Sequence, residues 1–287
     1  MPDPVAGARA PEPPRGRAGS GRPVLEIAVQ DVSGAVAAVR AGAQRLELCT
    51  ALAATGGVTP GIGLLERVLE AVPDVGVHVL VRPRPGGFVY APDEVDVLVR
   101  EVRAVVRSGA AGVVVGALTD DGRVDERVLG RLADEAQGVE LTFHRAFDAL
   151  TPVARQDVTP VPADDARPPA SRRRGAAVDG PMLAAALDVL AAHGVTRVLT
   201  SGGATRVGRG LPRIRTTVEL AAGRVQVMAG GGVQVAEIGT IVATGVDAVH
   251  LSASRTVSGD GGPGAGSDAS WTTTDPYLVA AARAALT

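Results

Sequence analysis

The stretch VLEIAVQDVSGAVAAVRAGAQRLELC, residues 24–49, decides the fold class of this chain. It begins with an apolar run typical of a β-strand, Val24–Val29, and continues into a helical run that ends at Gly42. A second strand pattern, Leu46–Cys49, follows within a few residues. Glycine ends helices in a left-handed conformation, and a strand, a helix and a strand in this order predict a pair of parallel strands.

The same theme recurs along the chain, because Gly109, Gly194 and Gly245 each end a helical run and lead into a short apolar strand. About eight candidate strands alternate with helical patterns: Val24–Val29, Leu46–Cys49, Val77–Arg82, Val113–Val115, Val139–His144, Val198–Thr200, Arg224–Met228 and Val249–Leu251. The sequence therefore predicts a single-domain α/β fold, a (β/α)8 TIM-type barrel. An open, doubly wound parallel sheet is the alternative, and the even spacing of the strands favours closure.

Three segments fall outside the strand and helix patterns. Residues 1–22, rich in Pro, Gly, Ala and Arg, are expected to form a disordered tail ahead of a barrel that spans residues 23–287. Residues 151–180 are expected to form a surface loop insertion, because they are polar and proline-rich. Residues 258–270 are expected to form a flexible linker to a helix at residues 275–286 that docks on the barrel.

The composition excludes several classes of function. The 29 basic residues are balanced by 31 acidic ones, which gives no electrostatic reason to expect nucleic acid or an anionic membrane as a partner. A single cysteine excludes an intrachain disulfide, and no apolar signal segment opens the chain, so we expect a cytoplasmic protein. Every basic residue is arginine. Without lysine there is no Schiff base, so pyridoxal phosphate and lysine-dependent aldolase chemistry are excluded.

Polar side chains share one face of most candidate strands, since side chains alternate between the two faces. The polar parity comprises Glu26, Glu47, Cys49, His78, Arg82, Thr142, His144, His250 and Ser252. In a barrel this parity faces the lumen, where an ionised group must be paired or serve a ligand. One interpretation is a structural network in which the glutamates neutralise Arg82 and Arg145. The other is a functional site, because Cys49, Arg82, His144 and Ser252 lie at the carboxyl ends of strands, where barrel enzymes build their sites.

Hydroxyl and glycine residues follow the last three strands. The run Gly230-Gly231-Gly232 comes after the seventh strand, Ser252 after the eighth, and Thr200-Ser201 ends the sixth. The loops after the seventh and eighth strands often bind phosphate in barrels, and glycine lets backbone N–H groups approach an anion closely. We therefore expect a small anionic ligand at this rim, with ordinary turn glycines as the alternative.

Several motifs occur together and in order: LEIAVQDVSGAVAAVRAGAQRLELCTAL, TGGVTPGIG, HVLVRPRPGGFVY, FHRAFDAL, RVLTSGG, and GGGV through AVHLSAS. In these motifs the chain resembles the CutC copper homeostasis family from about Val24 to Thr256. The resemblance implies a barrel that handles copper in the cytoplasm. It also implies copper as a cofactor with Cys49 as a metal ligand, although the family often has a second cysteine where this chain has Ala28. Met228, with His144 or His250, would complete such a site.

A competing hypothesis is an enzyme that acts on a small anionic or phosphorylated substrate. Glu26, Glu47 and His144 would then be the acid–base candidates. Arg82 and Arg145 would bind the anion. Asp148 would orient His144 or Arg145, with capping of the following segment as the alternative. The remaining residues expected to contact the ligand are His78, Thr200, Ser201, Gly230, Gly231, Gly232, His250 and Ser252. A non-catalytic scaffold is a third hypothesis, which a charged lumen disfavours. A homo-oligomer is expected for a barrel of this size.

Overall fold

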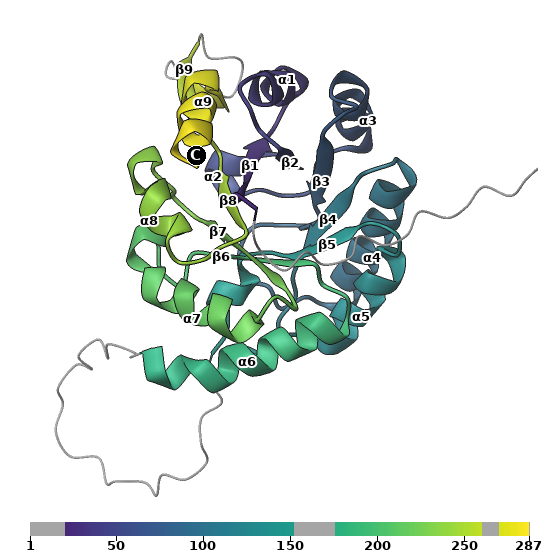
Figure 1. Cartoon of the computed structure of the whole chain (residues 1–287). Helices are drawn as coiled ribbons and strands as arrows, with labels where there is room; N and C mark the ends of the chain where they lie inside the picture. Colours follow the sequence, from purple (N-terminus) through teal and green to yellow (C-terminus); the bar gives the residue numbers. More distant parts are fainter. Residues whose placement is uncertain (1–20, 152–175, 260–269, 287) are drawn as a thin grey trace, which may run out of the picture.

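The computed structural model of this chain describes residues 21–151, 176–259 and 270–286. Within them, parallel strands form a closed barrel in the order β1 to β8, and helices surround it (Figure 1). Strand β8 pairs with β1, with His250 opposite Glu26. The predicted (β/α)8 barrel is therefore confirmed and the open sheet is excluded. The strands are β1 Val24–Val29, β2 Arg45–Leu48, β3 Gly76–Leu80, β4 Gly112–Val115, β5 Glu140–Phe143, β6 Arg197–Thr200, β7 Gln226–Gly230 and β8 Ala248–Leu251.

The helices bury one face against the outside of the barrel. Aspartates cap three of them, since the carboxylates of Asp31, Asp125 and Asp275 accept backbone N–H bonds in the first turns of α1, α5 and α9. Helix residues such as Leu98 and Leu132 are buried in the same cluster as outward-facing strand residues. The α-helices are α1 Val32–Arg40, α2 Leu52–Thr55, α3 Ile62–Ala71, α4 Pro92–Arg107, α5 Glu126–Glu135, α6 Ala176–Ala192, α7 Leu211–Ala221, α8 Ile238–Val242 and α9 Pro276–Ala285.

Side chains of alternate strand residues fill the lumen, as the polar parity predicts. The register places Glu26 opposite Arg45 and Glu47 opposite His78. Two small apolar clusters also lie on this parity, one of Cys49, Leu80 and Val114, the other of Leu199, Met228 and Ala248. The lumen is therefore a packed interior with polar and apolar regions.

The predicted loop insertion at residues 151–180 is wrong at its carboxyl end. Helix α6 begins at Ala176, so residues 176–180 are helical. Pro181 lies inside the helix, and the alanine-rich sequence on both sides has a high helix propensity. Residues 152–175 lie outside the described residues.

The predicted linker at residues 258–270 is wrong at both ends. Strand β9, Ser254–Ser258, pairs antiparallel with β10, Ser270–Thr274, and Ser258 lies opposite Ser270. Serine and threonine in such short strands resemble a polar linker in the sequence, so this hairpin was missed. Helix α9 agrees with the helix predicted at residues 275–286. Residues 260–269 lie outside the described residues, as do residues 1–20 of the tail predicted at residues 1–22.

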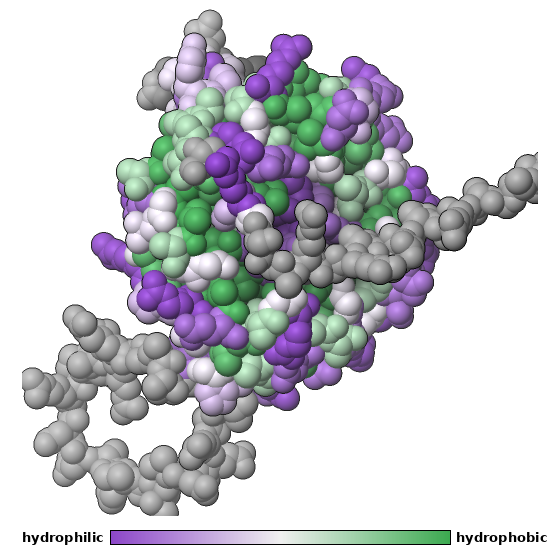
Figure 2. Space-filling view, in the orientation of Figure 1, coloured by the Kyte–Doolittle hydropathy of each residue, from purple (hydrophilic) through white to green (hydrophobic). Residues whose placement is uncertain are grey.

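The face shown in Figure 2 mixes hydrophilic and hydrophobic side chains, and hydrophilic ones gather around its middle, inside the ring of helices. None of the described helices is both long enough and apolar enough to cross a membrane.

Candidate active site

A pocket of about 350 Å³ lies at the carboxyl ends of the strands. Apolar wall residues include Leu80, Phe88 and Leu199. The structure brings these predicted site residues together in the pocket wall: Glu47, Arg82, His144, Arg145, Gly231, Gly232, His250 and Ser252. The other predicted residues lie outside its lining: Glu26, Cys49, His78, Asp148, Thr200, Ser201 and Gly230.

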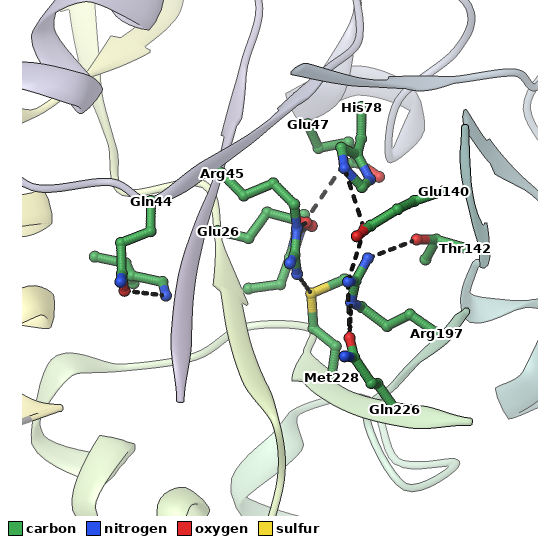
Figure 3. Close-up of polar contacts among 12 residues, drawn as sticks. Glu26, Gln44, Arg45, Glu47, His78, Glu140, Thr142, Arg197, Gln226 and Met228 are labelled. Atoms are coloured by element: carbon green, nitrogen blue, oxygen red, sulfur yellow. Dashed lines mark hydrogen bonds and ion pairs between the residues drawn. The ribbon is translucent and has the colours of Figure 1, made fainter. Parts of the chain in front are cut away.

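A network of polar side chains lies deeper in the lumen (Figure 3). Arg197 donates to Glu140 Oε2 at 2.9 Å and to Gln226 Oε1 at 2.7 Å. Arg45 forms an ion pair with Glu26 and approaches the Met228 sulfur at 3.3 Å. Each buried charge in this region has a partner of opposite charge, as in a structural network. The predicted pairs are wrong, however, because Glu26 pairs with Arg45, and Arg145 pairs with Asp148. We did not predict Arg45 or Arg197, although each shares the strand parity of the polar lumen residues.

His78 belongs to this deeper network. Its Nε2 lies 3.5 Å from Glu140 Oε2, and its Nδ1 is buried without a hydrogen-bond partner in the described residues. Burial, helped by the charges of Arg45 and Arg197, lowers the pKa of His78 to about 4. The imidazole is therefore neutral at pH 7, and its contacts are structural ones.

Glu26, His250 and Glu47 form a chain of contacts that leads from the deeper network to the pocket. The Glu26 Oε1 lies 2.7 Å from His250 Nδ1, and His250 Nε2 lies 3.7 Å from Glu47 Oε2. The Glu26 contact fixes which ring nitrogen of His250 faces Glu47. Among the described residues, the Glu47 carboxyl group has no hydrogen-bond partner.

The two glutamates differ in charge because their surroundings differ. Burial acts to raise the pKa of Glu26, but Arg45 and His250 hold it well below the usual range. Burial raises the pKa of Glu47 to about 7, against the opposing charge of His250. Burial acts to lower the pKa of His250, yet the two glutamates together raise it. Glu26 is therefore a permanent anion, whereas Glu47 exchanges a proton near neutral pH.

Arg82 brings a buried positive charge to the pocket wall. Its Nη1 donates to the carbonyls of Thr55 and Gly57 at 3.0 Å each, and its Nη2 donates to Gly86 O at 2.9 Å. No carboxylate of the described residues lies within ion-pair distance of it. The guanidinium also lies over the Phe88 ring, with Cζ 5.4 Å from the ring centroid.

His144 lies at the end of β5 with a fixed tautomer. Its Nδ1 accepts a hydrogen bond from Ala146 N at 3.1 Å, which leaves the proton on Nε2. Burial, with the nearby Arg82 charge, lowers the pKa of His144 to about 3. This neutral imidazole suits a hydrogen-bond donor better than a general base.

Asp148 holds the loop after β6 in place. Its carboxylate accepts from Thr200 Oγ1 at 2.5 Å, from Ser201 N at 2.9 Å and from Gly203 N at 2.9 Å. It also pairs with Arg145 Nε at 2.9 Å. The acceptor positions of Asp148 are therefore occupied, and its role here is to orient Arg145 and the loop rather than to move a proton.

The glycine rim allows close approach of side chains to the backbone. Gly230 is the last residue of β7 rather than part of the loop, while Gly231 and Gly232 have positive φ angles of 102° and 67°. A Cβ atom at Gly231 would lie 3.0 Å from Arg145 Cζ. Arg145 and Gly231 therefore lie against each other in the pocket wall.

The residues present do not fit a copper(I) site. The Cys49 thiol is fully buried against Leu80 and Val114, while Met228 belongs to the other apolar cluster and contacts Arg45. Burial raises the pKa of Cys49 above its usual value, which disfavours the thiolate that binds metal. Within residues 21–151, 176–259 and 270–286, no three His, Cys, Asp or Glu side chains are grouped to hold a metal ion.

Fold and pocket together define a barrel protein with titratable groups at the carboxyl ends of its strands. The chain belongs to the CutC family, whose model matches residues 23–156 and 178–255. It is 37% identical over 231 residues to a CutC family protein of Rhizobium meliloti, covering 80% of this chain and 81% of that protein. It is 37% identical over 245 residues to the human copper homeostasis protein cutC homolog, covering 85% of this chain and 78% of that protein.

A solved structure supports the same assignment. The crystal structure of a candidate copper homeostasis protein CutC from Streptococcus agalactiae matches with a TM-score of 0.65 and 26% identity, covering 80% of this chain and 98% of that chain. The predicted family is therefore confirmed. The segment between residues 156 and 178 falls outside the family match, as does the chain beyond residue 255.

Proposed function

We propose that this CutC family member is an enzyme that binds a small anionic metabolite in the pocket and moves a proton on it through Glu47. The observation that carries the proposal is the Glu47 carboxyl group, which lines the pocket without a hydrogen bond and has His250 Nε2 3.7 Å away. A buried carboxyl group that changes charge near neutral pH suits general acid–base catalysis.

In the proposed step, Glu47 takes a proton from a carbon atom next to a carbonyl group of the ligand. The C–H bond breaks, the proton goes to the Glu47 carboxylate, and the electron pair moves to the carbonyl oxygen as an enolate. Return of a proton to carbon completes an exchange that needs no further reactant. His250, held by Glu26, orients the Glu47 carboxyl group and exchanges protons with it.

Copper enters this proposal only through the names of relatives, since the human relative is called a copper homeostasis protein cutC homolog. We infer that any part this chain plays in copper homeostasis is indirect and works through its ligand. The buried thiol of Cys49 and the separate position of Met228 support this inference. We expect the activity in the cytoplasm, where a free thiol such as Cys49 stays reduced.

The test is deuterium exchange. The protein is incubated in D2O with a panel of small carboxylates and phosphorylated sugars, and loss of C–H proton signals is followed by NMR. We expect at least one compound to exchange with the wild type, and Glu47→Gln to slow that exchange at least about a hundredfold. Glu219→Gln, a change at an exposed residue, is the matched control. Exchange that continues unchanged in Glu47→Gln would contradict the proposal.

A further inference from the structure

Three buried polar atoms without hydrogen-bond partners belong to residues linked by contacts, and two of these residues, Arg82 and His144, line the pocket. The three atoms are Arg82 Nε, Tyr90 Oη and His144 Nε2. Phe88 connects two of these residues, because its ring centroid lies 5.4 Å from Arg82 Cζ and 4.9 Å from the centroid of the His144 ring. Tyr90 lies close enough for the Arg82 charge to oppose the effect of burial, which raises the pKa of Tyr90. Buried polar atoms left unpaired are costly, so a group of three calls for an occupant.

All three groups carry a proton that they can donate, and the Tyr90 oxygen, which lies beside Arg82, can also accept one. Arg82 has five N–H groups, of which three donate to backbone carbonyls. The remaining two are Nε–H and one Nη2–H. His144 carries its proton on Nε2 because Nδ1 accepts from a backbone N–H, and the Tyr90 hydroxyl keeps its proton at neutral pH. The missing partner is therefore an acceptor.

The charge of the group selects a monoanion. Arg82 is 8% exposed and has no carboxylate partner among the described residues, in contrast to Arg145, which pairs with Asp148, and Arg45, which pairs with Glu26. His144 and Tyr90 are neutral, so the three residues supply one positive charge. A carboxylate matches that charge, and its two oxygens fit one edge of a guanidinium group. A phosphate dianion would leave one negative charge buried without a partner.

We propose that Arg82, Tyr90 and His144 form a carboxylate-binding site, which makes the ligand of this barrel a small carboxylic acid. Phe88 covers the site in the free protein, since its ring packs on Arg82 and His144 and also lines the pocket. Movement of this ring opens the three donors to the pocket. The inference rests on the proposed function for the pocket and adds the chemical class of its ligand. Glu47 lines the same pocket, so a carboxylic acid bound at Arg82 shares this pocket with the Glu47 carboxyl group.

The first experiment compares three probes by isothermal titration calorimetry and by NMR of carboxyl-labelled butyrate. We expect butyrate to bind the wild-type protein, and butyramide, its uncharged isostere, to bind at least about tenfold more weakly because it lacks the charge-assisted bonds. Inorganic phosphate is expected to bind more weakly than butyrate. Failure of butyrate to bind, or equal binding of butyramide, would overturn the proposal, as would tighter binding of phosphate.

The decisive variant is Tyr90→Phe, which removes one hydroxyl group and keeps the ring. We expect it to weaken butyrate binding about tenfold, because it loses one hydrogen bond to a charged group. Its stability without ligand should stay close to that of the wild type, because the hydroxyl lies beside Arg82 but makes no well-aligned hydrogen bond in the free protein. A purely structural tyrosine would give the opposite pair of results. Val89→Ala, at a residue 44% exposed in the same loop, is the matched control and should bind like the wild type.

Arg82→Gln should abolish butyrate binding, but it also removes three bonds to loop carbonyls. If that variant fails to fold, Tyr90→Phe decides the question alone. Unchanged butyrate affinity in Tyr90→Phe refutes the site. The proposed acid–base function has a separate outcome, because Glu47→Gln should bind butyrate normally while losing deuterium exchange. If the wild type binds butyrate but exchanges no C–H proton of any compound in the panel, the acid–base function is refuted and the carboxylate site stands.

Discussion

Replacing Glu47 by glutamine should stabilise the protein in a way that depends on pH. The folded structure raises the pKa of this carboxyl group from its ordinary value of 4.5 to about 7. Between these two values the folded state binds more protons than the unfolded state, so the stability of the wild type falls as pH rises through this window. The shift of roughly 2.5 units corresponds to about 3 kcal/mol, because each unit is worth about 1.36 kcal/mol.

Glutamine carries no charge, so Glu47→Gln avoids this cost at every pH. We expect the variant to exceed the wild type by about 3 kcal/mol at pH 8 and by about 1 kcal/mol at pH 5. Urea denaturation followed by circular dichroism at both pH values measures the two differences. Glu219→Gln, at an exposed residue, should show no dependence of this kind. An equal or smaller gain at pH 8 than at pH 5 would refute the reasoning about burial of Glu47.

Four further changes test other parts of the structure. Asp148→Asn should destabilise the protein by about 2 kcal/mol in urea denaturation, because an amide nitrogen would face backbone N–H donors; unchanged stability would contradict its role in holding the loop. Gly112→Ala should cost about 1–3 kcal/mol, since a Cβ atom there would lie 2.6 Å from the His78 ring. Gly63→Ala, in α3 with open space around it, should instead stabilise by about 0.5–1 kcal/mol. In anaerobic calorimetry, Cys49→Ser should leave weak copper(I) binding unchanged, and tight one-to-one binding lost in the variant would contradict an indirect copper role.

Much of the candidate site could be predicted from strand parity alone. The alternation of side chains placed Glu26, Glu47, His78 and His250 in the lumen, and the register confirms their positions. Parity could not show which of them reaches the pocket, because that depends on depth along the barrel axis. Glu26 and His78 lie with the deeper network, whereas Glu47 and His250 line the pocket.

The sequence could not show which polar groups have hydrogen-bond partners in the folded structure. Asp148 was expected to orient a site residue, but its contacts with Thr200, Ser201 and Gly203 depend on how the β6 loop folds over η1, Arg145–Ala149. The sequence did not indicate Tyr90 as a site residue, because it lies in a loop outside the strand pattern. Its hydroxyl group lies beside Arg82 only as a result of tertiary packing.

The sequence by itself determined the barrel, its family and the exclusion of lysine chemistry. Glycine-ended helices, alternating strands and the absence of lysine are local or compositional properties, so no packing information is needed to read them. Only the tertiary structure decided that the pKa of Glu47 is raised to about 7, that Arg82 lacks a carboxylate partner among the described residues and that Cys49 is buried among apolar side chains. These properties arise from burial and from neighbours distant in the chain, and both exist only once the barrel has closed.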